Sequence, residues 1–206
     1  MNDVVLIDAG GANLGSVRYA FERLGARVST SADPAVIRAA SRVVLPGVGA
    51  AAAGMARLRE LGLVDVVRGL SQPLLGICLG MQLLYESSEE GDVECLGLLP
   101  GRVARLVPVD GTDDRPAVRV PHMGWNRLRR IGDSALLHGI DDGAQAYFVH
   151  SYAAPVGPAT LATATHGMEF PAVVGDGRRF GAQFHPERSA TVGTQLLRNF
   201  LSEAIA

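Results

Sequence analysis

The feature that most constrains the fold is an abrupt change from strand to helix around Cys78. Residues 74–77 are an apolar run that predicts a buried strand, and residues 79–84 continue as an apolar helix. Gly76 and Gly80 flank the cysteine in a Gly-x-Cys-x-Gly pattern. This pattern is typical of a nucleophile elbow, a sharp turn whose neighbours must be small so that strand and helix pack closely. It predicts an α/β fold with Cys78 at the carboxyl end of a strand.

A cysteine in this place gains reactivity from the helix that follows it. The amide dipoles of a helix N-terminus favour a thiolate on Cys78, and the amide of Leu79 points to where an oxyanion would form. A buried structural cysteine at a tight turn is the alternative interpretation. The chain has only one other cysteine, Cys95, and two cysteines are too few for a disulfide framework. Since one of the two stands at a special position, we expect the protein in a reducing compartment.

The first 90 residues alternate strand and helix signals, which predicts a parallel sheet with flanking helices. The expected strands are 4–8, 27–30, 43–45 and 73–78, and the expected helices are 14–24, 34–40, an Ala-rich stretch to about residue 70, and 79–86. Five acidic residues within 86–94 are interpreted as a solvated loop.

The second half has a different pattern. Between about residues 95 and 130 short strands and turns predict a smaller antiparallel patch. Further strands are expected at 146–152, 159–165, 172–175 and 179–184, and a closing helix at 191–205. With no repeat and no linker, we expect residues 1–206 to form a single domain.

A second chemical signal lies at His185-Pro186-Glu187, directly after an apolar strand. Proline holds this segment extended, so His185 and Glu187 project to the same side. Glu187 can then hydrogen-bond one imidazole nitrogen and leave the other facing a thiol, as the third member of a catalytic triad does. A surface turn with a solvated glutamate is the alternative. Because this motif and Cys78 both follow parallel strands, we expect them to meet at one edge of the sheet.

The third signal is Pro46-Gly47-Val48-Gly49, also at the end of a strand. Glycine on both sides of Val48 lets the backbone turn an amide toward a ligand or rotate it away. This suits a second oxyanion donor, whereas an ordinary strand-ending turn is the alternative.

Composition excludes several classes of protein. All 19 basic residues are arginine, which excludes a lysine Schiff base and a P-loop lysine. The net charge of −2 gives no general attraction to nucleic acid or membranes. The start of the chain lacks the pattern of a signal peptide, so we expect a soluble cytoplasmic protein.

The three segments, in this order and spacing, resemble class I glutamine amidotransferases, which release ammonia from glutamine through a cysteine thioester. The resemblance covers nearly the whole chain. Residues 121–126, 147–152 and 185–189 narrow the resemblance further. Together these segments resemble the glutaminase subunits of imidazole glycerol phosphate synthases, in histidine biosynthesis. The opening turn, residues 8–13, departs from the family pattern at 9–12, although Asn13 still matches.

The resemblance implies a role for each matching residue. Cys78 is the nucleophile, His185 the acid and base, and Glu187 its orienter, with the amides of Val48 and Leu79 as the oxyanion hole. The residues implied to hold the glutamine α-amino and α-carboxylate groups are Gly49, Gln82, Ser151 and Tyr152. Those implied to face a partner protein are Asn13, Trp125, Asn126, Tyr147 and Arg188. A buried core aromatic is the alternative for Trp125, and His122 and His150 are interpreted as structural.

The resemblance also implies the partner. It is a (β/α)₈-barrel cyclase that forms a heterodimer with this chain, consumes the ammonia and makes imidazole glycerol phosphate. No cofactor and no metal are expected.

Three alternatives stay open at this point. The first is a glutaminase of another pathway, such as vitamin B6, anthranilate or purine synthesis, which the segment 121–126 argues against. The second is a peptidase- or chaperone-like protein with a cysteine elbow. The third is a non-catalytic binding module that has kept the fold.

Overall fold

The computed structural model describes residues 3–10, 14–112 and 117–205. Its centre is an eight-stranded sheet in the order β2-β1-β3-β4-β14-β13-β12-β9. The first five strands of that order are parallel to one another, and the last four form antiparallel pairs. The parallel strands are β1 (Asp3–Ile7), β2 (Arg27–Ser31), β3 (Arg42–Gly47), β4 (Leu74–Cys78) and β14 (Arg179–Ala182). The antiparallel edge is β9 (Arg129–Arg130), β12 (Thr160–His166) and β13 (Met168–Asp176).

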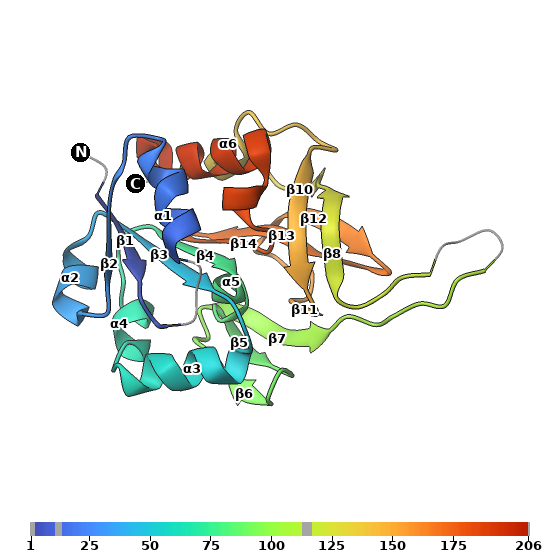
Figure 1. Ribbon diagram of the computed structural model, residues 1–206, viewed down its shortest axis with the longest axis horizontal. Helices are drawn as coiled ribbons and strands as arrows, with labels where there is room; N and C mark the ends of the chain where they lie inside the picture. The colour runs from blue at the N-terminus through green and yellow to red at the C-terminus, as the bar shows by residue number, and fades with distance from the viewer. Residues whose placement is uncertain (1–2, 11–13, 113–116, 206) are drawn as a thin grey trace.

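Helices cover both faces of this sheet (Figure 1). On one face lie α1 (Leu14–Glu22) and α6 (Ala190–Phe200), whose Phe21 and Phe200 rings meet edge to face. On the other lie α2 (Pro34–Ala39), α3 (Ala51–Glu60) and α4 (Val64–Arg68). All five residues of β4 are buried, as expected for a strand covered on both sides.

Two smaller sheets complete the molecule. One pairs β8 (His122–Arg127) with β10 (Gln145–His150), and the other has the order β11-β7-β5-β6. The strands of the second sheet are β5 (Tyr85–Ser88), β6 (Val93–Glu94), β7 (Leu99–Arg105) and β11 (Tyr152–Ala153). The prediction of an α/β fold with a mostly parallel central sheet and a smaller antiparallel patch is therefore confirmed.

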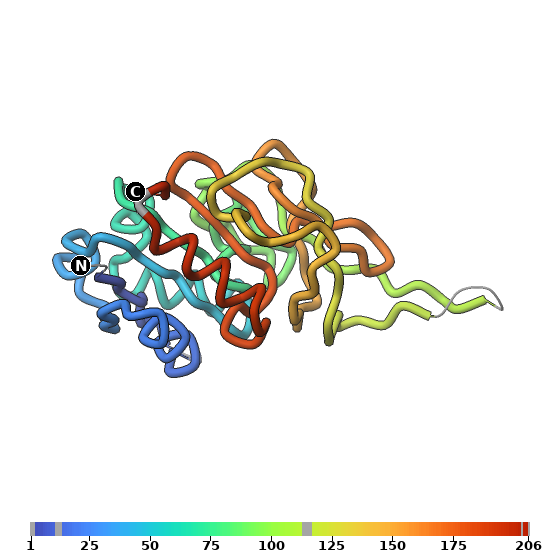
Figure 2. Tube along the Cα trace, turned by 90° about the horizontal axis from the view of Figure 1, so that it is seen from above, coloured from blue at the N-terminus to red at the C-terminus, as the bar shows by residue number. Residues whose placement is uncertain are grey.

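An arm leaves the body between β7 and β8, and Figure 2 shows it from above. Residues 106–112 and 117–121 run alongside each other, and Val109 and Val118 are bridged through their backbones. The remaining short elements are the 3₁₀ turns η1 (Ala135–Leu137), η2 (Pro186–Arg188) and η3 (Glu203–Ile205). No helix in the described part of the chain is long and apolar enough to cross a membrane.

Three helix predictions need correction. The helix expected over 79–86 is only α5 (Leu79–Gln82), because Tyr85 turns into the core and starts strand β5. The Ala-rich stretch forms two helices, α3 and α4, separated at Gly62, whose φ of +65° ends the first one. The predicted closing helix likewise stops at Phe200, before η3.

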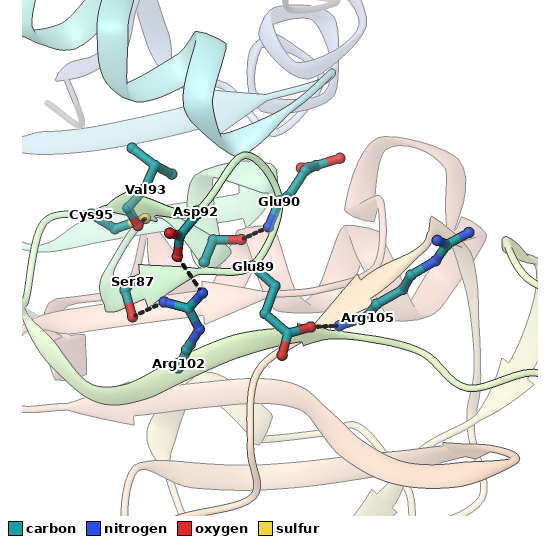
Figure 3. A network of polar contacts seen from close by, with 9 residues as sticks. Ser87, Glu89, Glu90, Asp92, Val93, Cys95, Arg102 and Arg105 are labelled. Carbon is teal, nitrogen blue, oxygen red and sulfur yellow. Dashed lines mark hydrogen bonds and ion pairs between the residues drawn. The ribbon is translucent and has the colours of Figure 1, made fainter.

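The acidic segment 86–94 is solvated, as expected, since all its acidic residues but Glu90 are exposed, but it is not a loop. It forms β5, β6 and the turn between them, and its carboxylates accept hydrogen bonds (Figure 3). Glu89 accepts from the backbone N–H of Arg105 at 2.9 Å, and Asp92 accepts from the Arg102 guanidinium at 2.6 Å. Glu90 accepts from the backbone N–H of Ala51 at 2.8 Å, where helix α3 begins. The negative charges therefore join β5–β6 to β7 and to the N-terminus of α3.

Candidate active site

Cys78 lies at the turn between β4 and α5, in a backbone conformation that residues with a side chain rarely adopt. Its φ is +52° and its ψ is −110°. A Cβ on Gly80 would lie 1.7 Å from the carbonyl oxygen of Leu45, and one on Gly76 would lie 2.6 Å from that of Gly80. Strand, turn and helix are thus packed backbone against backbone, which explains why both flanking positions are glycine.

His185 follows β14, the parallel neighbour of β4, so the two strand ends meet. Its Nδ1 lies 2.9 Å from Oε1 of Glu187, and the Cys78 side chain is close enough to raise the pKa of the ring. Because Nδ1 is taken by the carboxylate, Nε2 is the nitrogen that serves the thiol. The three residues that the sequence singled out are therefore brought together in the order thiol, imidazole, carboxylate.

The charge state of His185 is set by these two neighbours. Burial lowers the pKa of the imidazole, but hydrogen bonds and charge from Cys78 and Glu187 outweigh it and raise the pKa to about 10. The other carboxylate oxygen of Glu187, Oε2, is buried and has no hydrogen-bond partner among the described residues. His185 is therefore the polar group on which this buried carboxylate depends.

The glycine turn after β3 lies directly beside the elbow. Gly47 is in register with Cys78, and a Cβ on Gly47 would come within 2.8 Å of the amide nitrogen of Gly80. Gly49 has a φ of +91° with open space around it, and the side chain of Val48 is 42% exposed. The backbone next to Val48 is therefore placed close to Cys78, and Gly49 holds a conformation that residues with a side chain rarely adopt.

A cavity of about 230 Å³ opens at this edge of the sheet. Its walls come from α1, the glycine turn, β4, β10 and the segment after β14. The lining residues are Val17, Pro46, Gly47, Val48, Ile77, Val149, His185, Glu187 and Arg188. Its size suits a small molecule, and the bonded pair His185 and Glu187 contributes to its wall.

Two of the residues expected to bind glutamine, Gln82 and Tyr152, are connected to Cys78 by hydrogen bonds. Gln82 donates from Nε2 to the Tyr152 carbonyl at 2.8 Å and to Oε1 of Gln183 at 3.0 Å. Gln183 in turn has its Nε2 3.8 Å from the Cys78 sulfur. Gln82 and Tyr152 are thus in contact, whereas Gly49 lies apart on the glycine turn.

Sequence reasoning missed two groups that touch the Cys78 sulfur. One is Gln183, and the other is the carbonyl of Val149, 3.7 Å from Sγ. A signal for the first was present, because Gln183 lies two residues before His185 in an extended segment and so projects to the same side. The second is a backbone group, which residue types do not reveal.

The residues expected to face a partner divide into two groups. The Trp125 side chain is 52% exposed, its ring lies 5.9 Å from that of Tyr147, and the Arg188 guanidinium lies 4.7 Å above Tyr147. Asn126 comes next in β8, so its side chain lies on the opposite face, where it bonds His122 and the Thr165 carbonyl. Asn13 lies outside the described residues. The core interpretation of Trp125 is wrong, since half of the side chain is accessible.

Within the described ranges, no group of three His, Cys, Asp or Glu side chains is arranged to hold a metal ion.

Comparison with known proteins gives consistent matches over almost the whole chain. The family described as "Glutamine amidotransferase class-I" matches residues 5–204. "Imidazole glycerol phosphate synthase subunit HisH" of Xanthomonas axonopodis pv. citri (strain 306) is 61% identical over 201 residues, which is 98% of each chain. The protein of the same name from Xylella fastidiosa (strain Temecula1 / ATCC 700964) is 58% identical, again over 98% of each chain.

Solved structures agree in fold. A structure described as a glutamine amidotransferase superposes with a TM-score of 0.72 at 23% identity, over 98% of both chains. A glutamine amidotransferase from Thermotoga maritima gives a TM-score of 0.65 at 17% identity, over 98% of this chain and 97% of the other. At these identities the likeness concerns the fold alone.

Proposed function

Because the chain belongs to the class-I glutamine amidotransferase family, we propose that it is the glutaminase subunit of an imidazole glycerol phosphate synthase. It hydrolyses glutamine to glutamate and passes the ammonia to a cyclase partner, which makes imidazole glycerol phosphate and an aminoimidazole carboxamide ribotide. The observation that carries the proposal is the meeting of Cys78 with the bonded His185–Glu187 pair at one sheet edge. The 61% identity to a protein named for that enzyme supports the choice of pathway.

The reaction follows from the order of the three side chains. The Cys78 thiolate attacks the side-chain carbonyl carbon of glutamine, and the amides of Leu79 and Val48 stabilise the oxyanion. His185 protonates the leaving amine, which departs as ammonia and leaves a γ-glutamyl thioester. His185 then takes a proton from water, which attacks the thioester and releases glutamate. Glu187 orients the imidazole and stabilises its charged form.

Glutamine is held by its α-amino and α-carboxylate groups at Gly49, Gln82, Ser151 and Tyr152. The side-chain amide alone would not distinguish glutamine from other primary amides, so these contacts supply the specificity. The hydrogen bonds that connect Tyr152 and Gln82, through Gln183, to the Cys78 sulfur support this assignment.

The ammonia must reach its acceptor without contact with water, which would protonate it and remove its nucleophilicity. The partner is a (β/α)₈-barrel cyclase in a heterodimer with this chain, which acts as one domain over residues 1–206. Exposed Trp125 of β8 packs on half-buried Tyr147 of β10, the strand that also lines the cavity, and Arg188 lies above Tyr147, which supports this face as the interface. A free catalytic thiol is suited to the reducing cytoplasm.

The test compares two cysteine variants in the complex with the cyclase. Cys78→Ala abolishes glutamine hydrolysis while the complex still makes imidazole glycerol phosphate from added ammonium salt. Cys95→Ala, the matched control on a buried cysteine remote from the site, retains activity near wild type. Loss of activity in Cys95→Ala together with retention in Cys78→Ala would contradict the assignment of the nucleophile.

A further inference from the structure

Two buried histidines behind the site take no part in the reaction described above. His122 of β8 and His150 of β10 are opposite each other across the strand pair, with Nδ1 of His122 3.0 Å from Nε2 of His150. Their exposed fractions are 4% and 6%. A neutral imidazole has one N–H donor and one acceptor, so the direction of this bond depends on the tautomers.

One end of the contact fixes the tautomer of His150. Its Nδ1 lies 2.8 Å from the carbonyl oxygen of Tyr152, and a carbonyl can only accept. Nδ1 of His150 therefore carries the hydrogen. In the neutral ring Nε2 is then an acceptor, and it must receive its hydrogen from Nδ1 of His122.

The other end fixes the tautomer of His122 independently. The Asn126 amide has its oxygen 2.8 Å from the backbone N–H of Arg127 and its nitrogen 2.9 Å from the carbonyl of Thr165. Turning the amide over would oppose like groups at both contacts, so its Nδ2 donates. The second hydrogen of Nδ2 points to Nε2 of His122, 3.3 Å away. Nε2 of His122 is therefore an acceptor, and its Nδ1 carries the hydrogen. This is the tautomer that the bond between His150 and the Tyr152 carbonyl also requires.

Neutral rings are the state that this environment favours. No carboxylate within the described part of the chain hydrogen-bonds either ring. Burial, followed by the charges of neighbouring histidines, lowers the pKa of His122 to about 3. Burial also lowers the pKa of His150 to about 4, against the raising effect of the Tyr152 carbonyl. Protonating either ring would place two N–H donors face to face.

This series of hydrogen bonds ends at the backbone carbonyl of Tyr152, a residue of the proposed glutamine site. The Tyr152 carbonyl accepts one bond from His150 and one from Gln82, each 2.8 Å long. Gln82 continues through Gln183 to the Cys78 sulfur. The Tyr152 carbonyl is therefore the point where the support from β8 and the support from the nucleophile meet.

We propose that Asn126, His122 and His150 form a one-way hydrogen-bond chain that holds the Tyr152 carbonyl, and with it Gln82, in position for glutamine. We call these three residues and that carbonyl the histidine chain. The two histidines are positioning residues, and this inference rests on the proposed function. Through side-chain hydrogen bonds the histidine chain reaches the sulfur only by way of Gln82 and Gln183, so we expect it to act mainly on the binding of glutamine; the Val149 carbonyl, just before His150, is a separate backbone contact of the sulfur.

The first experiment reads the tautomers directly in the full-length protein. Two-bond ¹⁵N–¹H correlation spectra at pH 7 should show His122 and His150 as neutral rings protonated at Nδ1. Free histidine favours the other tautomer, so the expected result does not arise by default. A ring that is protonated at Nε2 alone, or that is charged, at either position would overturn the proposed histidine chain.

The second experiment measures glutamine binding through protection of Cys78 from alkylation by iodoacetamide. His150→Phe keeps an aromatic ring against Phe148 and Phe170 but removes both hydrogen bonds. We expect the glutamine concentration for half protection to rise about tenfold, the equivalent of ~1.4 kcal/mol, which is typical of leaving one buried group unpaired. His150→Asn keeps a donor near the Nδ1 position and restores part of the affinity.

The matched control is His166→Phe. His166 stacks on His122 with ring centroids 4.1 Å apart, but its Nε2 bonds the Arg119 carbonyl, outside the chain. Half protection should stay within about twofold of wild type. In the complex, His150→Phe should raise KM for glutamine more than it lowers kcat, whereas a generally loosened fold would also lower ammonium-dependent synthesis by the partner.

The outcomes separate this inference from the proposed function. If glutamine protects wild type and His150→Phe equally, the histidine chain does not position the site and the glutaminase proposal stands. If glutamine fails to protect wild-type Cys78, the glutaminase proposal falls, and with it the positioning role.

Discussion

At the scale of single residues, the chemistry depends on how His185 is held between a sulfur and a carboxylate. In the proposed mechanism His185 transfers the proton, so we expect His185→Ala to lower kcat for glutamine hydrolysis by roughly 10²–10⁴-fold. Glu187→Gln keeps a hydrogen-bond acceptor 2.9 Å from Nδ1 but removes the charge. We expect about a tenfold loss there, because a charge-assisted bond becomes a neutral one.

Steady-state glutamine hydrolysis in the complex measures both effects. Ammonium-driven synthesis by the same complexes is the control and should be unchanged. A Glu187→Gln variant as inactive as His185→Ala would show that the carboxylate does more than orient the ring. Two variants with full activity would remove the pair from the mechanism.

The sequence predicted this group of residues because each reveals itself locally. Cys78 stands between two obligatory glycines, and His185 and Glu187 lie two residues apart around a proline. The extended segment predicted for them is wrong, because Pro186–Arg188 form the 3₁₀ turn η2, and it is across this turn that the two side chains meet. The parallel pairing of β4 with β14 then brings them together. The contacts of Val149 and Asn126 were not predictable, because one is a backbone carbonyl and the other depends on which face of β8 is buried.

At the scale of elements, the position of the His-Pro-Glu turn depends on its contact with helix α6. A Cβ on Gly193 would lie 1.8 Å from the carbonyl oxygen of Pro186, so the helix backbone rests directly on the turn. Gly193→Ala must push the two apart. We expect a destabilisation of about 1–3 kcal/mol and a loss of glutaminase activity, because His185 moves with the turn.

Gly15→Ala in α1 is the matched control. The added methyl group would meet the Tyr19 ring at 3.9 Å, an ordinary contact. Gly15 lies in the first turn of α1, where alanine gains less than the roughly 1 kcal/mol of a helix interior, so stability should stay the same or rise slightly and activity should stay. Urea unfolding and hydrolysis assays on both variants test this. Equal behaviour of the two would mean that α6 does not position the turn.

The histidine chain also predicts how stability depends on pH. His122 and His150 have pKa values of about 3 and about 4 in the folded protein, below the unfolded value of 6.5. The unfolded chain therefore binds more protons between these values, and stability falls as the pH falls from 6.5 toward 4. Each ring contributes up to ~1.4 kcal/mol per pH unit in this window.

Urea unfolding of wild type and His150→Phe between pH 7 and pH 4 measures this contribution. The variant should lose less stability over that range, because one ring no longer resists protonation. His138→Gln, at an exposed histidine, should follow wild type. If His150→Phe loses as much stability as wild type on acidification, the result would contradict a neutral His150 ring in the folded protein.

Elements show where local patterns mislead. The alternation of strand and helix signals in the first half predicted the parallel strands, since short apolar runs between helical stretches leave few alternatives. The acidic segment 86–94 is exposed as predicted but forms strands instead of a loop, and its charges meet partners outside the segment, at Ala51, Arg102 and Arg105. The early end of α5 at Gln82 depends likewise on the burial of Tyr85 against β7.

At the scale of the whole molecule, the sheet edge, the cavity and the exposed aromatic pair lie on one connected surface. Val149 lines the cavity, and its strand β10 also carries Tyr147, which meets Trp125. Arg188 lines the cavity too, and its guanidinium lies above Tyr147. A partner seated on this surface would therefore touch residues in direct contact with the site, which gives a physical route for coupling.

We expect the chain alone to be nearly inactive as a glutaminase and to be activated by the partner with its acceptor substrate. The reason is the turn at Val48, where the peptide between two glycines can present either its carbonyl or its amide to the site. Without that amide the oxyanion keeps only the Leu79 donor, which costs roughly 10²–10³-fold in rate. The free energy that corresponds to this rate factor lies at or above the usual ~1–3 kcal/mol of coupling between two sites. We therefore expect other contacts to contribute to the activation too.

Gly49→Ala tests whether this turn is the switch. Its φ of +91° is unfavourable for alanine although no atom stands within 4 Å, so the change narrows the freedom of the turn without a clash. Held in either conformation, the turn should give a smaller ratio of glutamine hydrolysis between the liganded complex and the isolated chain. Gly62→Ala carries a similar backbone penalty, at φ +65° in open space between α3 and α4, and should leave the ratio unchanged. A full activation ratio in Gly49→Ala would place the switch elsewhere in the molecule, and an isolated wild-type chain as fast as the liganded complex would remove it.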